Sequence, residues 1–355
     1  MQNVRVFLFL SGVIPLCVAS MEELPTQTYK PSTSISDVKI KDACFISSNL
    51  FAVSKDFSTH ICIYDSNSKK SRSTIKCDGP VNTISQYDNF KKISVACYDN
   101  VHIFDTQTGQ LIRGYKTDSK RVNSLHAHPA VEQILVAGSE NGTIKVLDLR
   151  ESDPIVKEMR AEHQGEVNMV RVAGKGAYFV SASDDKTTKI WEASASESLH
   201  TIRNVAPKAL AYNAQGNKFM VCANYLNRYD AFTAALVATF NRHGTQESDR
   251  GSKIVATDLG IASCISTGID DRELIVLGTK DGKIVFFNPE NTKITPTILQ
   301  PFNGPVNALT FCPNGTCLVA GCQLEQKMHI YELSNKKDSP ILQKRSSIKT
   351  GGCLP

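Results

Sequence analysis

The sequence lacks the motifs by which the common catalytic and cofactor sites are recognised. It contains no phosphate-binding G-x-x-x-x-G-K-[ST] loop, no G-x-G-x-x-G after an apolar strand, no H-E-x-x-H and no G-x-S-x-G. Beyond the N-terminus, no apolar run approaches the ~20 residues that a membrane-spanning helix needs. We therefore expect a protein that is not an enzyme, binds no cofactor and does not span a membrane.

An excess of charge of one sign is also missing. The 355 residues include 40 Lys and Arg against 35 Asp and Glu, and 41% of them are hydrophobic, which excludes a disordered polar chain. Five basic residues lie within 331–355, so most of the net charge of +5 belongs to a C-terminal tail. A nucleic-acid binder usually carries a basic stripe on its folded body, and we expect no direct binding to nucleic acid.

Residues 1–20 have the layout of a secretory signal peptide. Arg5 precedes an apolar run over 6–19, and small residues follow it. The same run also fits a strand or helix packed on the body, or a leader that is never made because translation starts at Met21. We expect the protein in the cytoplasm or nucleus, with secretion as the alternative.

The 11 cysteines fit either compartment. Three of them, Cys97, Cys222 and Cys322, fall at matching places in apolar strands, where free cysteine behaves as a small hydrophobic residue. Cys312 and Cys317 flank a turn and could form a hairpin disulfide in a secreted protein; otherwise we expect free thiols. Cys317 and Cys322 are an odd number of residues apart on one strand, so they face opposite sides and do not share a metal. Two N-glycosylation sequons, which are also good turn sequences, begin at Asn141 and Asn314.

Internal repetition is the strongest signal in the chain. Short apolar segments ending in an acidic or amide residue recur at intervals of 40, 43, 44, 38, 58 and 44 residues; they end at Asp65, Asp105, Asp148, Glu192, Asp230, Asn288 and Glu332. A Val-Asn pair precedes four of these ends, and weaker copies at Lys41, Pro207 and Ile261 mark the other three; the amides are Asn82, Asn123, Asn168 and Asn307. Seven units of one kind are therefore predicted.

Each unit has the pattern of a small antiparallel sheet. In the unit 165–202, the apolar segments VNMVRV, AYFVSAS and TTKIWE are separated by the turns GKG and DDK, and a fourth strand, SLHTIR, follows. Four strands in about 40–45 residues, repeated, are typical of propeller blades. We predict an all-β fold: one seven-bladed β-propeller of four-stranded antiparallel blades.

The segment EHQGEVNMVRV…YFVSASDDKTTKIWE resembles a blade of the WD-repeat family, and the likeness extends over about residues 37–345. It implies a hydrogen-bonded tetrad at His163, Ser181, Asp185 and Trp191, with Glu162 in place of the family's Gly. The other units carry only part of this set: the third has Asn141 and Leu147, and the sixth offers His243 and Asp281 but has Leu277 and Phe287.

The predicted organisation follows from the repeat. Residues 1–20 are a possible signal peptide or leader, 21–36 a further leader, 37–345 the propeller and 346–355 a tail. The last blade needs an outer strand, which either 340–345 or 26–30 could supply. Closure of the ring removes sheet edges that would otherwise invite aggregation.

One face of the predicted propeller collects the candidate binding residues. The recurrent amides Asn82, Asn123, Asn168 and Asn307 would ring one mouth of the channel, where they could bind a peptide or tie each blade to its neighbour. Charged residues suited to orienting a protein partner lie near the same rim: Arg121, Glu140, Glu166, Asp184 and Lys280. The long polar insert 241–260 is expected on this face too.

Two further motifs have modest interpretations. His126 and His128 resemble half of a metal site, but we assign them to the turn between the first two strands of their blade. The segment 136–150 is similar to the box by which some WD-repeat proteins dock onto the adaptor of a cullin-RING ubiquitin ligase, with Asp148 and Arg150 as the candidate docking residues.

The resemblance implies a scaffold that assembles other proteins or peptides, as a monomer within a complex. A ubiquitin-ligase substrate receptor and a secreted or lumenal propeller that binds a ligand are the alternatives. Fold does not determine function, so this step rests on family likeness.

Overall fold

The computed structural model describes residues 28–334, apart from 37–39, 88–90, 129–130, 132, 161, 175–177, 204–206, 208, 214, 224–225, 242–252, 257–261, 268–273, 290–296 and 314. The segments 1–27 and 335–355, the sequon at Asn314, His243 and most of the insert 241–260 lie outside the described residues. All regular elements described are β-strands. The described residues contain no helix that is long and apolar enough to cross a membrane.

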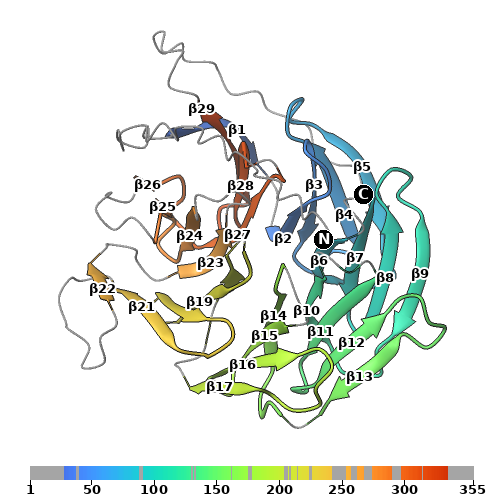
Figure 1. Cartoon of the computed structure of the whole chain (residues 1–355). Helices are drawn as coiled ribbons and strands as arrows, with labels where there is room; N and C mark the ends of the chain where they lie inside the picture. Colours follow the sequence, from blue (N-terminus) through green and yellow to red (C-terminus); the bar gives the residue numbers. More distant parts are fainter. Residues whose placement is uncertain are drawn as a thin grey trace, which may run out of the picture.

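The chain forms seven sheets arranged in a ring, each with four antiparallel strands, as the prediction of a seven-bladed propeller requires (Figure 1). Blades 1 to 3 contain β2 (Ile40–Phe45), β3 (Leu50–Lys55), β4 (His60–Asp65) and β5 (Ser71–Lys76); β6 (Val81–Tyr87), β7 (Lys92–Cys97), β8 (Asn100–Asp105) and β9 (Leu111–Lys116); and β10 (Val122–Ala127), β11 (Ile134–Ser139), β12 (Ile144–Asp148) and β13 (Ile155–Met159).

The remaining blades repeat this order. Blades 4 and 5 contain β14 (Val167–Val172), β15 (Tyr178–Ser183), β16 (Thr187–Glu192) and β17 (His200–Arg203); and β18 (Ala209–Tyr212), β19 (Lys218–Cys222), β20 (Leu226–Asp230) and β21 (Leu236–Asn241). Blades 6 and 7 contain β23 (Ala262–Thr267), β24 (Ile275–Thr279), β25 (Ile284–Phe287) and β26 (Thr297–Leu299); and β27 (Val306–Phe311), β28 (Cys317–Cys322) and β29 (Lys327–Ser334), with β1 (Thr28–Ser36).

The N-terminal strand closes the ring. β1 (Thr28–Ser36) pairs antiparallel with β29 and is the outer strand of blade 7. Of the two closing segments considered from the sequence, the one before the propeller therefore does the closing. Residues 28–36 are part of blade 7, whereas the sequence analysis had placed them in a leader.

The described part of the insert also lies at a blade's outer edge. β22 (Lys253–Ala256) pairs parallel with β21 and adds a fifth strand to blade 5. These four residues extend the sheet outward and do not lie on the face where the sequence analysis had placed the insert.

The hydrophobic core lies between the blades. Seven clusters of buried apolar side chains each join two successive blades, and one of them joins blade 7 to blade 1. Cys317 belongs to the cluster between blades 7 and 1, whereas Cys322 belongs to the one between blades 6 and 7. The alternation of a strand thus directs the two thiols to opposite faces, as predicted.

Polar side chains link the inner strands of neighbouring blades near the channel. A first strand has one edge without a partner in its own sheet, so some of its backbone N–H groups need another acceptor. Asp42 accepts a hydrogen bond from Ile84 N at 2.9 Å, Ser85 from Ala127 N at 3.1 Å, and Ser124 from Val170 N at 3.1 Å. Each acceptor lies one blade before its donor.

Candidate functional site

The candidate site is the face formed by the turns between second and third strands and by the connectors between blades; we call it the loop face. Antiparallel pairing places these turns, the connectors and the start of each inner strand at the same end of the blades. The turns between first and second and between third and fourth strands lie on the opposite face.

A β-bulge marks the start of six inner strands. The pairing register shifts at one residue in blades 1, 2, 3, 4, 6 and 7, and that residue is Lys41, Asn82, Asn123, Asn168, Ser263 and Asn307, respectively. A bulge leaves its extra residue unpaired in the ladder and redirects the side chain. The repeated Val-Asn motif is therefore the sequence signature of this bulge in four blades.

In blades 1 to 3 the bulge residues join neighbouring blades. Lys41 Nζ donates to Asn82 Oδ1 at 2.9 Å, and Asn82 Nδ2 donates to the carbonyl oxygen of Val122 at 3.1 Å. Asn123 Nδ2 donates to Glu166 Oε2 at 3.2 Å. These amides hold blades together, which is the second of the two roles that the sequence analysis had considered.

Arg121 organises the charged side chains on blades 3 and 4. Its Nε donates to Asn123 Oδ1 at 2.9 Å, and its guanidinium lies 3.6 Å from Glu140 and 3.5 Å from Glu166. All three charged side chains stay partly exposed. The structure thus brings four of the predicted rim residues into one cluster, Arg121, Asn123, Glu140 and Glu166, which we call the charged cluster.

The other predicted rim residues make their side-chain hydrogen bonds outside this cluster, although Asp184 N donates to the carbonyl oxygen of Glu166 at 3.0 Å. Asn168 Nδ2 donates to Asp184 Oδ1 at 2.7 Å within blade 4, and Asn307 Oδ1 accepts from Gln323 N at 2.9 Å within blade 7. Lys280 is exposed in the corresponding turn of blade 6. The nine predicted rim residues therefore do not form one continuous ring.

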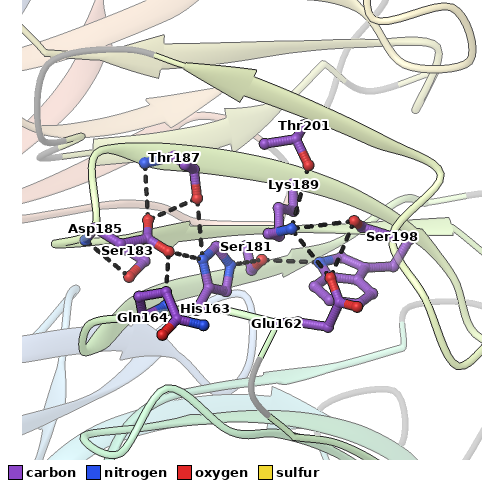
Figure 2. A network of polar contacts seen from close by, with 11 residues as sticks. Glu162, His163, Gln164, Ser181, Ser183, Asp185, Thr187, Lys189, Ser198 and Thr201 are labelled. Atoms are coloured by element: carbon purple, nitrogen blue, oxygen red, sulfur yellow. Dashed lines mark hydrogen bonds and ion pairs between the residues drawn. The ribbon is translucent and has the colours of Figure 1, made fainter.

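Blade 4 contains a buried polar chain that ties the loop face to the core (Figure 2). His163 Nδ1 lies 2.8 Å from Asp185 Oδ2, and His163 Nε2 lies 2.7 Å from Ser181 Oγ. The indole Nε1 of Trp191 donates to the same Ser181 oxygen at 2.8 Å. Thr187 adds a bond from its hydroxyl to Asp185 Oδ1 at 2.6 Å. The four residues implied by the resemblance are hydrogen-bonded in one chain.

The surroundings of Asp185 and His163 determine the protonation states of these two side chains. Burial opposes ionisation of Asp185, but hydrogen bonds from Thr187 and His163 outweigh it and lower the pKa of that carboxyl to about 2. Burial lowers the pKa of His163 even though Asp185 raises it. A neutral imidazole beside a carboxylate is consistent with one ring nitrogen donating to Asp185 and the other accepting from Ser181.

Two lysines on equivalent third strands are buried in blades 3 and 4. Lys189 Nζ lies 3.0 Å from Glu162 Oε2 and donates to Ser198 and Thr201 (Figure 2). Lys145 Nζ lies 3.2 Å from Glu158. The replacement of the family's Gly by Glu162 thus supplies the counter-charge for Lys189, since a buried cation needs a partner.

Blade 7 has an apolar version of the same arrangement. The paired strands place Ala320 and Tyr331 where Ser181 and Trp191 lie in blade 4. Phe302 corresponds to His163, since each precedes the first residue of its inner strand by four positions. All three blade 7 side chains lie in the core cluster between blades 6 and 7. The Tyr331 hydroxyl is buried and makes no hydrogen bond in the described part of the chain.

The structure corrects the interpretation of His126. This residue lies within the inner strand β10, not in a turn, and its Nδ1 accepts from Val172 N of blade 4 at 3.3 Å. Burial and the nearby Arg171 lower the pKa of its imidazole to about 3. His128 does lie in the following turn, where its Nδ1 accepts from Val131 N at 2.8 Å.

Two charged residues of the inner strands were missed by the sequence analysis. Burial raises the pKa of Asp42, although bonds from Ile84 N and Thr83 and the charge of Arg171 oppose the shift. Burial also lowers the pKa of Arg171, and Asp42 partly offsets this. The sequence signal for Asp42 and Arg171 was a charged residue within an apolar strand. It could not show that the two charges interact, because that depends on the distance between blades.

The candidate docking residues lie on the opposite face. Asp148 ends β12, and Arg150 follows it in the turn to β13. The two side chains bind each other, with Nε to Oδ1 at 2.8 Å and Nη2 to Oδ2 at 2.5 Å, and the Arg150 side chain is 57% exposed. Among the described residues, no three metal-ligating side chains lie close enough to hold an ion.

The family model that matches this chain does so at three of its repeat units. The sequence model for the WD domain, G-beta repeat matches residues 109–148, 156–192 and 296–331. Each match runs from the outer strand of one blade through the first three strands of the next. The repeat unit in the sequence therefore begins one strand before the blade in the structure. Blade 7 shows the same shift of one strand, because its outer strand, β1, comes from the distant N-terminal part of the chain.

Curated relatives cover part of the chain. Protein ROOT INITIATION DEFECTIVE 3 of Arabidopsis thaliana is 25% identical over 231 residues, which are 59% of this chain and 49% of that protein. Actin-interacting protein 1 of Drosophila melanogaster is 24% identical over 305 residues, 81% of this chain and 48% of that protein. Pre-mRNA-processing factor 17 of Homo sapiens is 35% identical over 100 residues, 27% of this chain and 17% of that protein. The chain spans about half the length of the first two relatives.

A solved structure shares the fold over nearly the whole chain. A chain in the structure titled "Crystal Structure of Mitotic Checkpoint Complex" matches with a TM-score of 0.72, covering 94% of this chain and 100% of that chain. The sequence identity of 17% makes this a likeness of fold.

Proposed function

The chain belongs to the WD-repeat family of β-propellers, and we propose that it is a non-enzymatic scaffold that binds other proteins through its loop face in the cytoplasm or nucleus. The observation that carries this proposal is the charged cluster, in which Arg121, Glu140 and Glu166 are held in fixed positions yet stay partly exposed. Charges fixed before binding orient a partner and lose little conformational freedom when it arrives.

Family context supports the proposal without naming a partner. The similar proteins include an actin-interacting protein, a pre-mRNA-processing factor and a chain of a checkpoint complex. Each of these names describes that relative. What these proteins share with this chain is the repeat, which provides a rigid ring with exposed turns.

Affinity purification of the full chain from its own cells tests the scaffold role. We expect proteins to co-purify in fixed ratio with the wild type and to be depleted by Arg121→Ala combined with Lys280→Ala on the loop face. Melting temperatures of the purified variants serve as the folding control. A wild type that purifies alone at every salt concentration would contradict the proposal.

Docking to a ubiquitin-ligase adaptor is the second candidate function. The observation that favours it is the exposed guanidinium of Arg150, which Asp148 holds in place on the opposite face. Arg150→Ala should abolish pull-down of the adaptor while leaving thermal stability unchanged. The same variant should leave loop-face partners bound, so each face provides the control for the other.

A further inference from the structure

The three most exposed large apolar side chains of the described residues lie on the loop face. Phe57 is 85% exposed, Leu324 is 73% exposed and Tyr98 is 61% exposed. They occupy the turns between second and third strands of blades 1, 7 and 2, which are consecutive around the ring. Other exposed apolar residues are spread over outer strands and the opposite face. We call these three residues the apolar arc.

The backbone conformation of these turns does not favour the two aromatic residues that occupy them. The backbone φ of Phe57 is 53° and that of Tyr98 is 55°. Tyr98 is the first residue of a two-residue hairpin turn, where a positive φ is needed and Gly, Asn or Asp is normally found. Bulky side chains in this region are strained, and such strain concentrates at functional sites.

Hydrogen bonds fix the turns that carry the arc. Gln323 Nε2, next to Leu324, donates to Asp56 Oδ2, next to Phe57, at 2.7 Å and so joins blade 7 to blade 1. The carbonyl oxygen of Ser58 accepts from Val81 N at 3.0 Å, and that of Tyr98 accepts from Val122 N at 2.7 Å. The arc is therefore held on a rigid support.

Carboxylates accompany the arc. Asp56 and Asp99 are chain neighbours of Phe57 and Tyr98, and Asp78 is exposed in the connector between blades 1 and 2. Asp78 Oδ2 lies 3.5 Å from His102 Nε2, and the charge of Asp56 partly offsets the burial that lowers the pKa of Lys41. Among the described residues, none of the three carboxylates lies within ion-pair distance of Lys or Arg. A bound cation would therefore find acidic groups beside the apolar side chains.

The same turn is polar in three other blades. Glu140 and Asn141 occupy it in blade 3, Asp184 and Asp185 in blade 4, and Lys280 and Asp281 in blade 6. Among the six blades whose turn the structure describes, the arc is thus confined to blades 7, 1 and 2, and the repeat by itself does not produce it.

We propose that the apolar arc binds a peptide segment of a protein partner in which bulky apolar side chains stand next to Lys or Arg. This inference rests on the proposed scaffold function and identifies which part of the loop face carries the apolar contact. Aromatic side chains are enriched among the residues that dominate binding energy, and exposed apolar patches mark interaction sites. The flanking carboxylates select basic residues over acidic ones.

Selection from a displayed library of random peptides tests the proposal on the full chain. We expect the selected peptides to combine Leu, Phe or Trp with neighbouring Lys or Arg. Their affinity should fall by about tenfold or more in a variant with Phe57→Asn, Tyr98→Asn and Leu324→Gln. Asp99→Asn should weaken peptides that contain Lys or Arg more than peptides in which those residues are replaced by Gln.

A matched variant on the opposite face controls for loss of apolar surface. Val131→Asn changes a partly exposed apolar turn residue there and should leave peptide affinity unchanged. Because Asn tolerates a positive φ, the arc variant should melt at the temperature of the wild type or above it. Selected peptides that bind the wild type and the arc variant equally, or that are rich in acidic residues, would overturn the proposal.

Two other occupants of the arc are outcomes of the same design. Self-association of the wild type that the arc variant abolishes would assign the arc to a second copy and overturn the proposal. Tighter peptide binding after removal of residues 1–20 would assign it to this chain's own apolar segment, with the same consequence. If the arc variant changes nothing while Arg121→Ala with Lys280→Ala still depletes co-purifying proteins, the arc proposal fails and the scaffold function stands.

Discussion

Blades 3 and 4 and blades 7, 1 and 2 use the same turns of the same fold in opposite ways. On blades 3 and 4, Arg121 pairs with Glu140 within blade 3 and with Glu166 across the blade boundary, and the polar chain of blade 4 reaches from the loop face into the core. On blades 7, 1 and 2, apolar side chains stand exposed in turns that polar residues would suit better. The difference teaches that the two sides of the loop face offer a partner different contacts: blades 3 and 4 present paired charges that orient it, and blades 7, 1 and 2 present exposed apolar side chains.

Blade 7 shows that the polar chain is one of two workable solutions. Phe302, Ala320 and Tyr331 fill the space that His163, Ser181 and Trp191 fill in blade 4. Apolar packing requires no hydrogen-bond partners, whereas each member of a buried polar chain depends on the others. Substitutions in the two blades should therefore differ in effect.

The largest expected effect is that of Trp191→Ala. The side chain is fully buried, stacks on Phe179 at 5.8 Å between ring centroids and donates to Ser181. Its removal should lower the free energy of unfolding by ~3–5 kcal/mol. Denaturant titration measures this, and an unchanged midpoint would contradict the role of Trp191 in the core.

Ser181→Ala should be the next largest change. The Ser181 oxygen is bonded to both His163 and Trp191, so its loss leaves two buried polar groups without their partner. We expect a loss of about 1–3 kcal/mol in the free energy of unfolding. Tyr331→Phe in blade 7 is the matched control and should leave the free energy of unfolding unchanged or raise it by up to about 1–3 kcal/mol, because it removes a buried hydroxyl that makes no hydrogen bond among the described residues.

Acidification should destabilise the buried polar chain of blade 4, first through protonation of His163 and then, at lower pH, through protonation of Asp185. Burial holds the pKa of His163 below its usual 6.5, so protonation favours the unfolded state and stability falls as the pH drops below 6.5. Asp185, with its pKa lowered to about 2 from 3.8, adds stability that is present above pH 3.8 and is lost between 3.8 and 2.

The difference between wild type and variant isolates this dependence. His163→Gln removes one titrating group, so its melting temperature should decline less between neutral and mildly acidic pH than that of the wild type. His126, whose pKa is about 3, remains in both proteins and contributes equally to each. Parallel pH profiles for the two proteins would show that His163 is not the group responsible.

Relief of backbone strain should give a smaller effect of opposite sign. Phe57→Asn and Tyr98→Asn place a residue that tolerates positive φ in each turn, and neither aromatic side chain is buried. The free energy of unfolding should stay the same or rise by up to ~1 kcal/mol per substitution. A clear loss of stability in calorimetry would mean that these side chains serve packing.

The smallest expected change is that of Arg121→Ala. Its ion pairs with Glu140 and Glu166 are partly exposed and longer than 3.4 Å, so the loss should be at most ~1 kcal/mol and should shrink in high salt. Denaturant titration at low and high ionic strength checks both points. A large loss that salt does not reduce would show that the charged cluster stabilises the ring through another contact.

The fold was predictable because its information is local and repeated. Interval, alternation and turn residues recur in each unit, and every recurrence supports the same four-stranded sheet. The tetrad could also be located, since its members fall at fixed positions relative to Trp191. The closing strand could not be chosen, because two segments at opposite ends of the chain had a suitable pattern.

The binding face was harder to predict, because it depends on geometry between blades. The Val-Asn motif located the bulges, but only the structure shows that Asn82 and Asn123 are used between blades. The inner-strand acceptors Asp42 and Ser85 likewise depend on the distance to the next blade. A signal for the arc was present as Tyr98 in a two-residue turn, where an aromatic residue is unexpected.

Hydroxyl-radical footprinting of the free chain and of its purified complex tests the division of the loop face most directly. The account predicts that oxidation of Phe57, Tyr98 and Leu324 falls several-fold in the complex, because a partner covers these exposed side chains. Phe232, exposed in a turn on the opposite face, should be oxidised at the same rate in both samples. Unchanged oxidation of the arc together with protection of Phe232 would contradict the account and move the binding surface to the other face.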